Sequence, residues 1–209
     1  MLAVFEKSIG KPPAELNLPS TGSKKSKSRQ EIAEIFQILW PETILCNISN
    51  GNFMGLSHEN ESPLHPRSLV VMDDIFCMFI GTLENICELK RHYGLSRQAT
   101  EAMDCDGGVD LNWGIAGDGS LICSNDSNLM KEACGISCAP FPPGCMFMNG
   151  TGLMSFVHPL HKVRAIVHED DDRQIRGVSF QVDLYTRLPS IPRSGSAANW
   201  ADATAVEAE

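Results

Sequence analysis

Cysteine and histidine side chains give this sequence its first candidates for metal or nucleophile chemistry. Cys134, Cys138 and Cys145 lie close together, but their C-x3-C-x6-C spacing is not a recognised zinc pattern, and no second compact pair completes four ligands. His158 and His161 are separated by a proline and a leucine, so they cannot form the i,i+4 pair of a helical metal site. The spacing therefore predicts small, buried thiol side chains, with neither a metal centre nor a cofactor.

Two acidic stretches offer a second kind of chemistry, the binding of calcium through carboxylate oxygens. Asp104–Gly108 (DCDGG) begins like a calcium loop, but it lacks the later ligands and the bidentate glutamate of an EF-hand, so a turn is the better interpretation. His168–Arg173 (HEDDDR) is a run of charge, and such runs are usually solvated loops. The sequence also contains no P-loop, no nucleophile elbow and no dinucleotide fingerprint. Local motifs alone therefore predict no catalytic class.

Composition limits the compartment and the partners. The chain has 209 residues, of which 43% are hydrophobic, enough for one core, and its formal net charge of -9 argues against nucleic acid as a partner. No apolar run is long enough to span a bilayer, and MLAVFEKSIG becomes charged too early for a signal peptide, which predicts a cytoplasmic chain with reduced thiols. A basic cluster, Lys24, Lys25, Lys27 and Arg29, favours a solvated loop, while nuclear or peripheral membrane association stays open.

Short strands and a few helices are predicted to position these side chains. Apolar residues at helical spacing predict helices over 29–40, 82–94 and 127–134. Apolar runs bounded by turn residues predict the strands. These strands are expected at 2–5, 43–49 and 51–57, on both sides of Asp73-Asp74 within 67–81, on both sides of the Gly-Asp-Gly turn within 108–126, after a Pro-Gly turn within 139–148, and at 152–159 and 177–188. This mixture predicts an α+β fold.

Several stretches, taken in chain order, carry a family resemblance. They are MLAVF, MDDIFCMFIGTLENICELKRHYGL, GGVDLNWGIAGDGSLICSND, APFPPGCMF, GLMSFVHP and VDLYTRLPSIPRSGSAANWA. Together they resemble the plant aluminium-induced and stem-specific proteins, which are known for YGL and LRDR motifs. That family in turn resembles the class II glutamine amidotransferase domain, an N-terminal-nucleophile hydrolase. The resemblance implies an α-β-β-α sandwich of two antiparallel sheets whose first strand starts at residue 2.

The resemblance also implies where a catalytic site would lie, and this chain departs from it at the reacting residue. In active class II amidotransferases an N-terminal Cys attacks the glutamine amide, with its own α-amino group as the base, but Leu2 occupies that position here. Ile80 stands where the oxyanion-stabilising Asn is expected, whereas Gly81 keeps the neighbouring oxyanion Gly. Arg67, in HPR, matches the Arg that binds the substrate carboxylate. The resemblance therefore implies no catalytic residue and leaves Arg67 and Gly81 as a residual binding site.

A second departure lies in the middle of the chain. YGL is present as Tyr93–Leu95, but LRDR is absent, and Met103 joins directly to the DCDGG stretch. Several dozen residues of the family pattern are missing at this point, which would remove a helix and two strands from the sandwich. We therefore expect open sheet edges around Thr100 to Gly108 and a chain of low stability.

These residues predict binding rather than catalysis. One amidotransferase-like domain is expected over 1–188, truncated internally near 103–104, followed by a flexible tail over 189–209. We interpret it as a non-catalytic domain of a plant aluminium- or stress-responsive protein with a binding or scaffolding role, whose partner is an unknown protein or a small carboxylate ligand. Two alternatives stay open: an enzyme that hydrolyses glutamine or another amide through a displaced nucleophile, Cys77 or Cys87, and a structural module that homodimerises.

Overall fold

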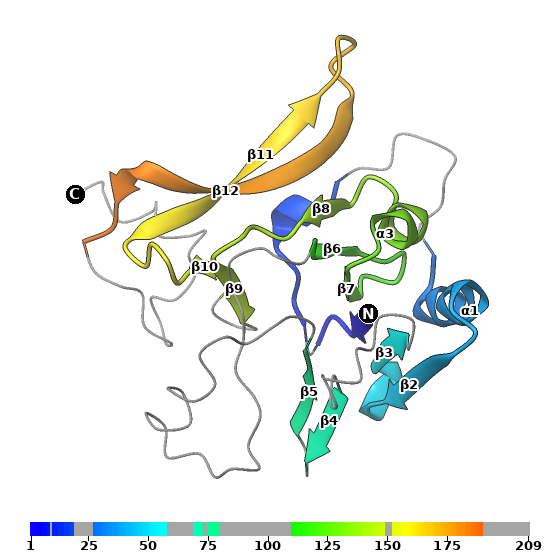
Figure 1. The fold of residues 1–209 in the computed structure, drawn as a ribbon. Helices are drawn as coiled ribbons and strands as arrows, with labels where there is room; N and C mark the ends of the chain where they lie inside the picture. The colour runs from blue at the N-terminus through cyan, green and yellow to red at the C-terminus, as the bar shows by residue number, and fades with distance from the viewer. Residues whose placement is uncertain are drawn as a thin grey trace, which may run out of the picture.

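β1 (Leu2–Phe5) lies in the interior of a six-stranded sheet with the order β2-β3-β1-β7-β6-β8, in which every neighbouring pair is antiparallel. The computed structural model describes residues 1–8, 10–18, 27–57, 69–72, 75–79, 110–148 and 152–189. The α-helices and the other strands in these ranges (Figure 1) are α1 (Arg29–Leu39), β2 (Thr43–Asn47), β3 (Phe53–Ser57), β4 (Leu69–Met72), β5 (Ile75–Met78), β6 (Asn112–Ile115), β7 (Leu121–Ser124), α3 (Ser127–Cys134), β8 (Cys138–Pro140), β9 (Cys145–Met148), β10 (Gly152–Ser155), β11 (His161–Glu169) and β12 (Ile175–Arg187). Two short 3-10 helices, at Ala14–Leu16 and Ser49–Gly51, complete the described elements.

Alternation along β1 divides its side chains between the two faces of the sheet. Leu2 and Val4 are completely buried in the core beneath the helices, whereas Phe5 packs against the core on the opposite face. Leu2 pairs in register with Gly55 of β3 on one side and with Ser124 of β7 on the other. The strand is therefore enclosed both by its neighbours in the sheet and by the layers above and below it.

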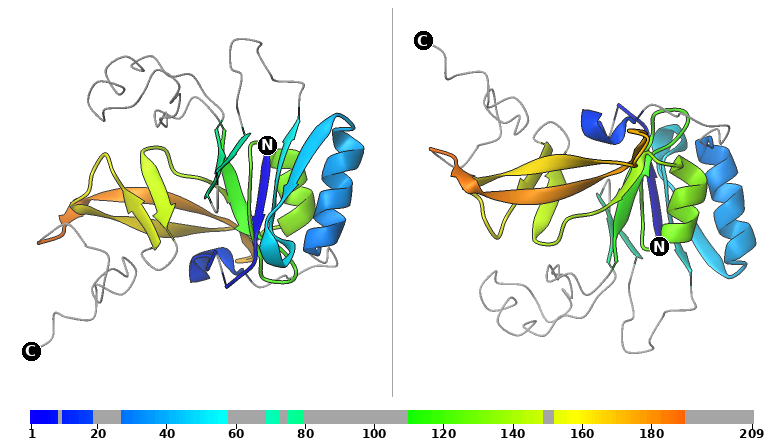
Figure 2. Two further views of the ribbon diagram at one scale, coloured as in Figure 1. Left: turned by 90° about the horizontal axis from the view of Figure 1, so that it is seen from below. Right: turned by 90° about the horizontal axis from the view of Figure 1, so that it is seen from above.

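Helices α1 and α3 cover one face of the six-stranded sheet, as both views of Figure 2 show. A capping box formed by Ser28 and Glu31 begins α1, and the helix ends one residue before Trp40, which Pro41 follows. Gly55 of β3 admits α1 closely, because a Cβ at that position would lie 2.6 Å from Cε1 of Phe36. The buried residues of this helix–sheet core are Leu2, Val4, Ile32, Phe36, Phe53, Ala116, Ile122, Leu129, Met130, Ala133 and Cys134.

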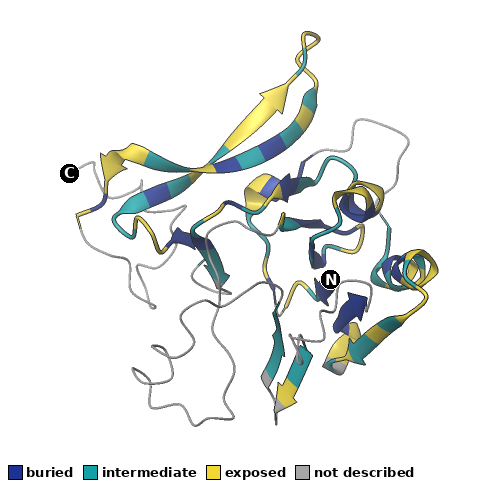
Figure 3. Ribbon diagram, in the orientation of Figure 1, coloured by how far each residue is buried: buried dark blue, intermediate teal, exposed yellow. Residues whose placement is uncertain are grey.

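The β9–β10 and β11–β12 hairpins cover the opposite face of the sheet. Within the described ranges β4–β5, β9–β10 and β11–β12 are three separate two-stranded sheets, all antiparallel. Val178 and Phe180 of β12 are buried in the core that this hairpin shares with the six-stranded sheet (Figure 3). There Trp113 of β6 is fully buried and meets the rings of Phe141, Phe147 and Phe180 edge-on, at centroid distances of 5.1 to 5.6 Å. This aromatic cluster joins the two β layers.

The α+β class predicted from the sequence is confirmed. The helices expected over 29–40 and 127–134 are α1 and α3, and the hairpin expected around the Asn50-Gly51 turn is β2–β3. The strands on either side of the Gly-Asp-Gly turn are β6 and β7. The sequence did not predict β11, which the structure places beside β12 as the longest pairing in the second layer.

The layered sandwich implied by the family resemblance is present in part. A helical layer, a six-stranded sheet and a second β layer follow one another in the described residues. The helix expected over 82–94, the sheet edges around Thr100 to Gly108 and all but the first residue of the tail expected over 189–209 lie outside the described residues. Neither helix in the described ranges combines the length and the apolar character needed to cross a bilayer.

Candidate functional site

The position that the amidotransferase resemblance assigns to the nucleophile is a packing position. Leu2 is 0% exposed and forms part of the core between the six-stranded sheet and the two helices. Its neighbours in that core include Val4 and Ile122, which alternate onto the same face of the sheet. An aliphatic side chain has no atom that can attack an amide carbon, so this end of β1 contributes apolar packing.

Polar groups next to Leu2 hold the amino terminus in place. The Met1 amino group donates a hydrogen bond to Oδ1 of Asn125 at 2.8 Å, and Oγ of Ser124 donates to the Met1 carbonyl at 2.7 Å. Burial lowers the pKa of the Met1 amino group, and the nearby carboxylate of Asp126 opposes that shift without cancelling it. A lowered pKa suits an amine to act as a base, but the adjoining Leu2 offers it no nucleophile to activate.

The remaining residues of the sequence-predicted site are not brought together in the described part of the chain. Arg67, Ile80 and Gly81 lie outside the described residues, as does Cys87, one of the two alternative nucleophiles. Cys77, the other alternative, is half-buried in β5 and pairs in register with Val70 of β4. Of the predicted site, the structure therefore describes Leu2, whereas the binding role of Arg67 and Gly81 stays a prediction from the sequence.

Burial makes the thiols nearest the two cores weak nucleophiles. It raises the pKa of Cys123 to about 12, and it also raises the pKa values of Cys134, Cys138 and Cys145 above the ordinary thiol value. Because the thiolate is the reactive form, these side chains stay protonated and unreactive near neutral pH. None of the six cysteines in the described ranges is in a disulfide, and those ranges contain no group of three or more potential metal ligands.

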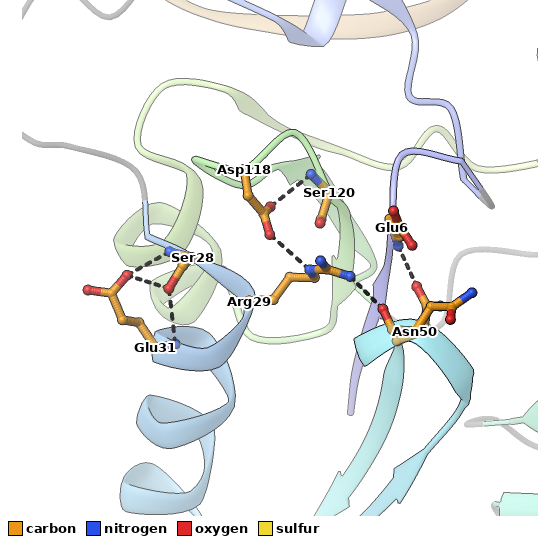
Figure 4. Close-up of polar contacts among 8 residues, drawn as sticks. Glu6, Ser28, Arg29, Glu31, Asn50, Asp118 and Ser120 are labelled. Carbon is orange, nitrogen blue, oxygen red and sulfur yellow. Dashed lines mark hydrogen bonds and ion pairs between the residues drawn. The ribbon is translucent and has the colours of Figure 1, made fainter.

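Polar contacts gather where α1 begins (Figure 4). Nε of Arg29 lies 2.8 Å from Oδ2 of Asp118, and its Nη1 donates to the Asn50 carbonyl at 3.0 Å. Asp118 Oδ1 also accepts from the Ser120 amide at 3.0 Å, which fixes the carboxylate in the β6–β7 turn. One guanidinium thus fastens the helix to turns on two different strand pairs.

The basic cluster identified in the sequence contributes to these contacts. Lys27 pairs with Glu132 of α3 at 3.0 Å, and Arg29 pairs with Asp118, so both cations are used within the fold. Lys24 and Lys25 lie outside the described residues. The two described members of the cluster therefore have structural roles within the fold.

A pocket of about 370 Å³ lies between the β9–β10 and β11–β12 hairpins. It is lined by Pro143, Gly144, Ser155, Val157, His158, Val182 and Leu184. His161 follows the lining residue His158 by three positions in the chain. Its Nδ1 is 2.9 Å from the Asp183 carbonyl oxygen. The sequence excludes an i,i+4 helical pair for these histidines, but Pro159 between them also indicates the turn that joins β10 to β11 and brings them together.

Comparison with known proteins gives the relationships of the chain. A family model described as "Aluminium induced protein" matches residues 2–104 and, in a second part, 102–182. The stem-specific protein TSJT1 of Nicotiana tabacum is 59% identical over 105 residues, which cover 49% of this chain and 70% of that protein. No solved structure matches the chain. The two parts of the family match meet beside Met103, where the sequence predicts the missing segment.

Proposed function

The chain belongs to the aluminium-induced protein family, and from this premise we propose that it is a non-catalytic, amidotransferase-like domain with a binding or scaffolding role. The observation that carries the proposal is the complete burial of Leu2. A catalytic nucleophile must reach its substrate, whereas this side chain is enclosed between the sheet and the helices. The position is therefore committed to packing, and a loss of the nucleophile removes the covalent route of this enzyme class.

The surroundings of the remaining thiols support the same proposal. A displaced cysteine would need a lowered pKa or an adjacent base to attack an amide. Four described thiols, Cys123, Cys134, Cys138 and Cys145, instead have raised pKa values because they are buried. A displaced nucleophile would accordingly have to be a cysteine other than these four.

A glutaminase assay tests the catalytic part of the proposal. The purified chain should release ammonia from glutamine no faster than a boiled control. Leu2→Cys, with Met1 removed, should stay inactive as well, because Ile80 offers no amide donor to the oxyanion. Turnover that survives repurification and disappears on thiol alkylation would contradict the proposal and favour the displaced-cysteine enzyme. Turnover by the Leu2→Cys variant would show that the rest of the amidotransferase site is intact.

The binding part of the proposal centres on the residual carboxylate site, Arg67 and Gly81. A guanidinium binds a carboxylate through two parallel hydrogen bonds, so the loss of Arg67 should reduce the affinity for a carboxylate ligand more than the loss of Gly81. Isothermal titration with glutamine and with glutamate should give binding that Arg67→Ala weakens by about tenfold or more, because even one hydrogen bond to a charged group contributes about 1.5–3 kcal/mol. Arg173→Ala, at an exposed position in the β11–β12 hairpin, is the matched control and should bind unchanged. Equal affinities in the two variants would remove Arg67 from the site.

A further inference from the structure

His158 and His161 meet in the turn between β10 and β11. Their ring centroids are 6.1 Å apart and their planes are nearly perpendicular, at 87°. The His161 amide donates to the His158 carbonyl at 2.9 Å, which closes a turn and holds the two residues near each other. The turn, which contains Pro159, thereby brings the two imidazoles together outside any helix.

The contact of His161 with β12 fixes which of its ring nitrogens carries a proton. Nδ1 lies 2.9 Å from the carbonyl oxygen of Asp183, and a carbonyl can only accept, so Nδ1 is the protonated donor. In the neutral ring the lone pair is then on Nε2. A backbone carbonyl bound to one nitrogen, which orients the ring and leaves the other nitrogen free to coordinate, is the usual arrangement of a metal-bound histidine.

His158 supplies the second imidazole and access from solvent. Its side chain is exposed, and it forms part of the wall of the pocket of about 370 Å³ described above. Two imidazoles on one tetrahedral zinc ion have centroids about 5 Å apart, given Zn–N bonds of about 2.0–2.1 Å. The two ring centroids are 6.1 Å apart in the structure, so they must approach each other by about 1 Å to share an ion. A rotamer change of the exposed His158 can provide this movement.

We propose that His158 and His161 together bind a divalent transition-metal ion of the zinc type at the edge of this pocket. Imidazole nitrogens suit zinc, copper and nickel, whereas magnesium and calcium prefer oxygen ligands. Zinc normally takes four ligands, and the described residues offer no third histidine, thiolate or carboxylate grouped with this pair. The other two positions are therefore open to water or a small molecule in the pocket, which makes the site an exchangeable one rather than a structural one.

Isothermal titration of the full chain with zinc chloride, in chelator-free buffer with a phosphine reductant, tests this site. One zinc ion should bind per chain, and His158→Gln and His161→Gln should each weaken that binding by at least tenfold. His168→Gln, at an exposed position of the same hairpin where the ring contacts Ser179, is the matched control and should bind as the wild type does. Magnesium chloride should give no binding.

Because His161 bonds to β12, its substitution can disturb the hairpin, so the exposed His158→Gln variant is decisive. Unchanged zinc affinity in His158→Gln, or equal losses in His158→Gln and His168→Gln, would overturn the proposal. Cobalt provides a second readout, since thiolate ligation gives an intense near-ultraviolet charge-transfer band that an imidazole-only site lacks. The spectrum should lack this band, and its appearance would assign the metal to cysteines instead of the histidine pair.

Discussion

Arg29 joins three segments that lie far apart in the sequence. Its guanidinium contacts Asp118 in the β6–β7 turn and the Asn50 carbonyl ahead of β3, while its backbone begins α1. Burial raises the pKa of the Asp118 carboxyl, but the hydrogen bonds from Ser120 and the pairing with Arg29 together outweigh it, so the pKa lies below the ordinary value. The carboxylate is therefore held in its charged form by partners that exist only in the folded state.

Acid should weaken this ion pair. A carboxyl whose pKa is depressed on folding stabilises the fold above its unfolded pKa of about 3.9, and that contribution is lost as the pH falls through the folded pKa. Asp118→Asn should thus lower the free energy of unfolding by about 1 kcal/mol or less at pH 7, the range of partly exposed pairs. The difference from wild type should shrink below about pH 4 in urea titrations. Asp171→Asn, exposed in the hairpin turn, should show no such trend, and a difference independent of pH would contradict the assignment.

Single residues could be placed from the sequence only where a local pattern marked them. Leu2 could be placed in a strand because its neighbours are apolar, and the resemblance assigned its role. The contact between Arg29 and Asp118, and the meeting of His158 with His161 beside β12, could not be predicted. Such contacts depend on how distant segments pack, which no local periodicity encodes.

Gly114 shows how one residue sets the distance between elements. It lies in β6 under the turn that joins α3 to β8, where an added Cβ would lie 2.7 Å from the Ser137 carbonyl oxygen and 2.9 Å from Sγ of Cys134. The Ser137 carbonyl belongs to the backbone and already accepts a hydrogen bond from the Ile115 amide at 2.9 Å. It cannot move aside without breaking the link between β6 and this turn.

Alanine at position 114 should therefore push the turn between α3 and β8 away from β6. We expect Gly114→Ala to lower the free energy of unfolding by about 1–3 kcal/mol, the usual cost of overpacking a core. Gly177→Ala in β12 is the matched control, because nothing lies within 4 Å of an added Cβ there. Urea denaturation of both variants provides the comparison. Equal stabilities would mean that the α3–β8 turn adapts more readily than its backbone contacts indicate.

The elements that could be predicted are those whose apolar residues recur at a regular spacing and whose ends are marked by capping or turn residues. α1 combines apolar residues at helical spacing with a serine cap and a following proline, and its predicted bounds were correct to within a residue. β11 was missed because most of its side chains are exposed, which leaves no clean alternation of apolar and polar residues to read. Its place in the fold comes from pairing with β12.

On the scale of the whole molecule, the second β layer consists of hairpins that do not join into one sheet in the described residues. A two-stranded hairpin is marginally stable by itself, and unpaired strand edges invite association. Large apolar side chains are also exposed on β11 and β12, namely Ile166, Val167, Leu184 and Tyr185. We expect the absence of the family segment that the sequence predicts to be missing after Met103 to lower the stability of this layer most.

We therefore predict that the isolated chain is poorly soluble, molten or dependent on a partner. A domain's net stability is only about 5–15 kcal/mol, and each uncovered core side chain forfeits about 1.5–3 kcal/mol of burial. Thermal unfolding, size-exclusion chromatography and dye binding should be compared with those of a full-length relative that contains the missing segment. A sharp, cooperative transition from a monodisperse monomer would show that the hairpin layer suffices without it.

The position of β1 also affects how the chain folds during synthesis. β1 pairs with β3 and β7, and Leu2 lies opposite Gly55 and Ser124, so one side of the strand can pair early and the other only after β7 has been translated. At about 5–20 residues per second, the ribosome takes about 6–25 s to pass from Leu2 to Ser124. During that interval the backbone groups on one edge of the apolar strand β1 have no sheet partner. We therefore expect β1 to be a binding segment for a chaperone that acts on the nascent chain.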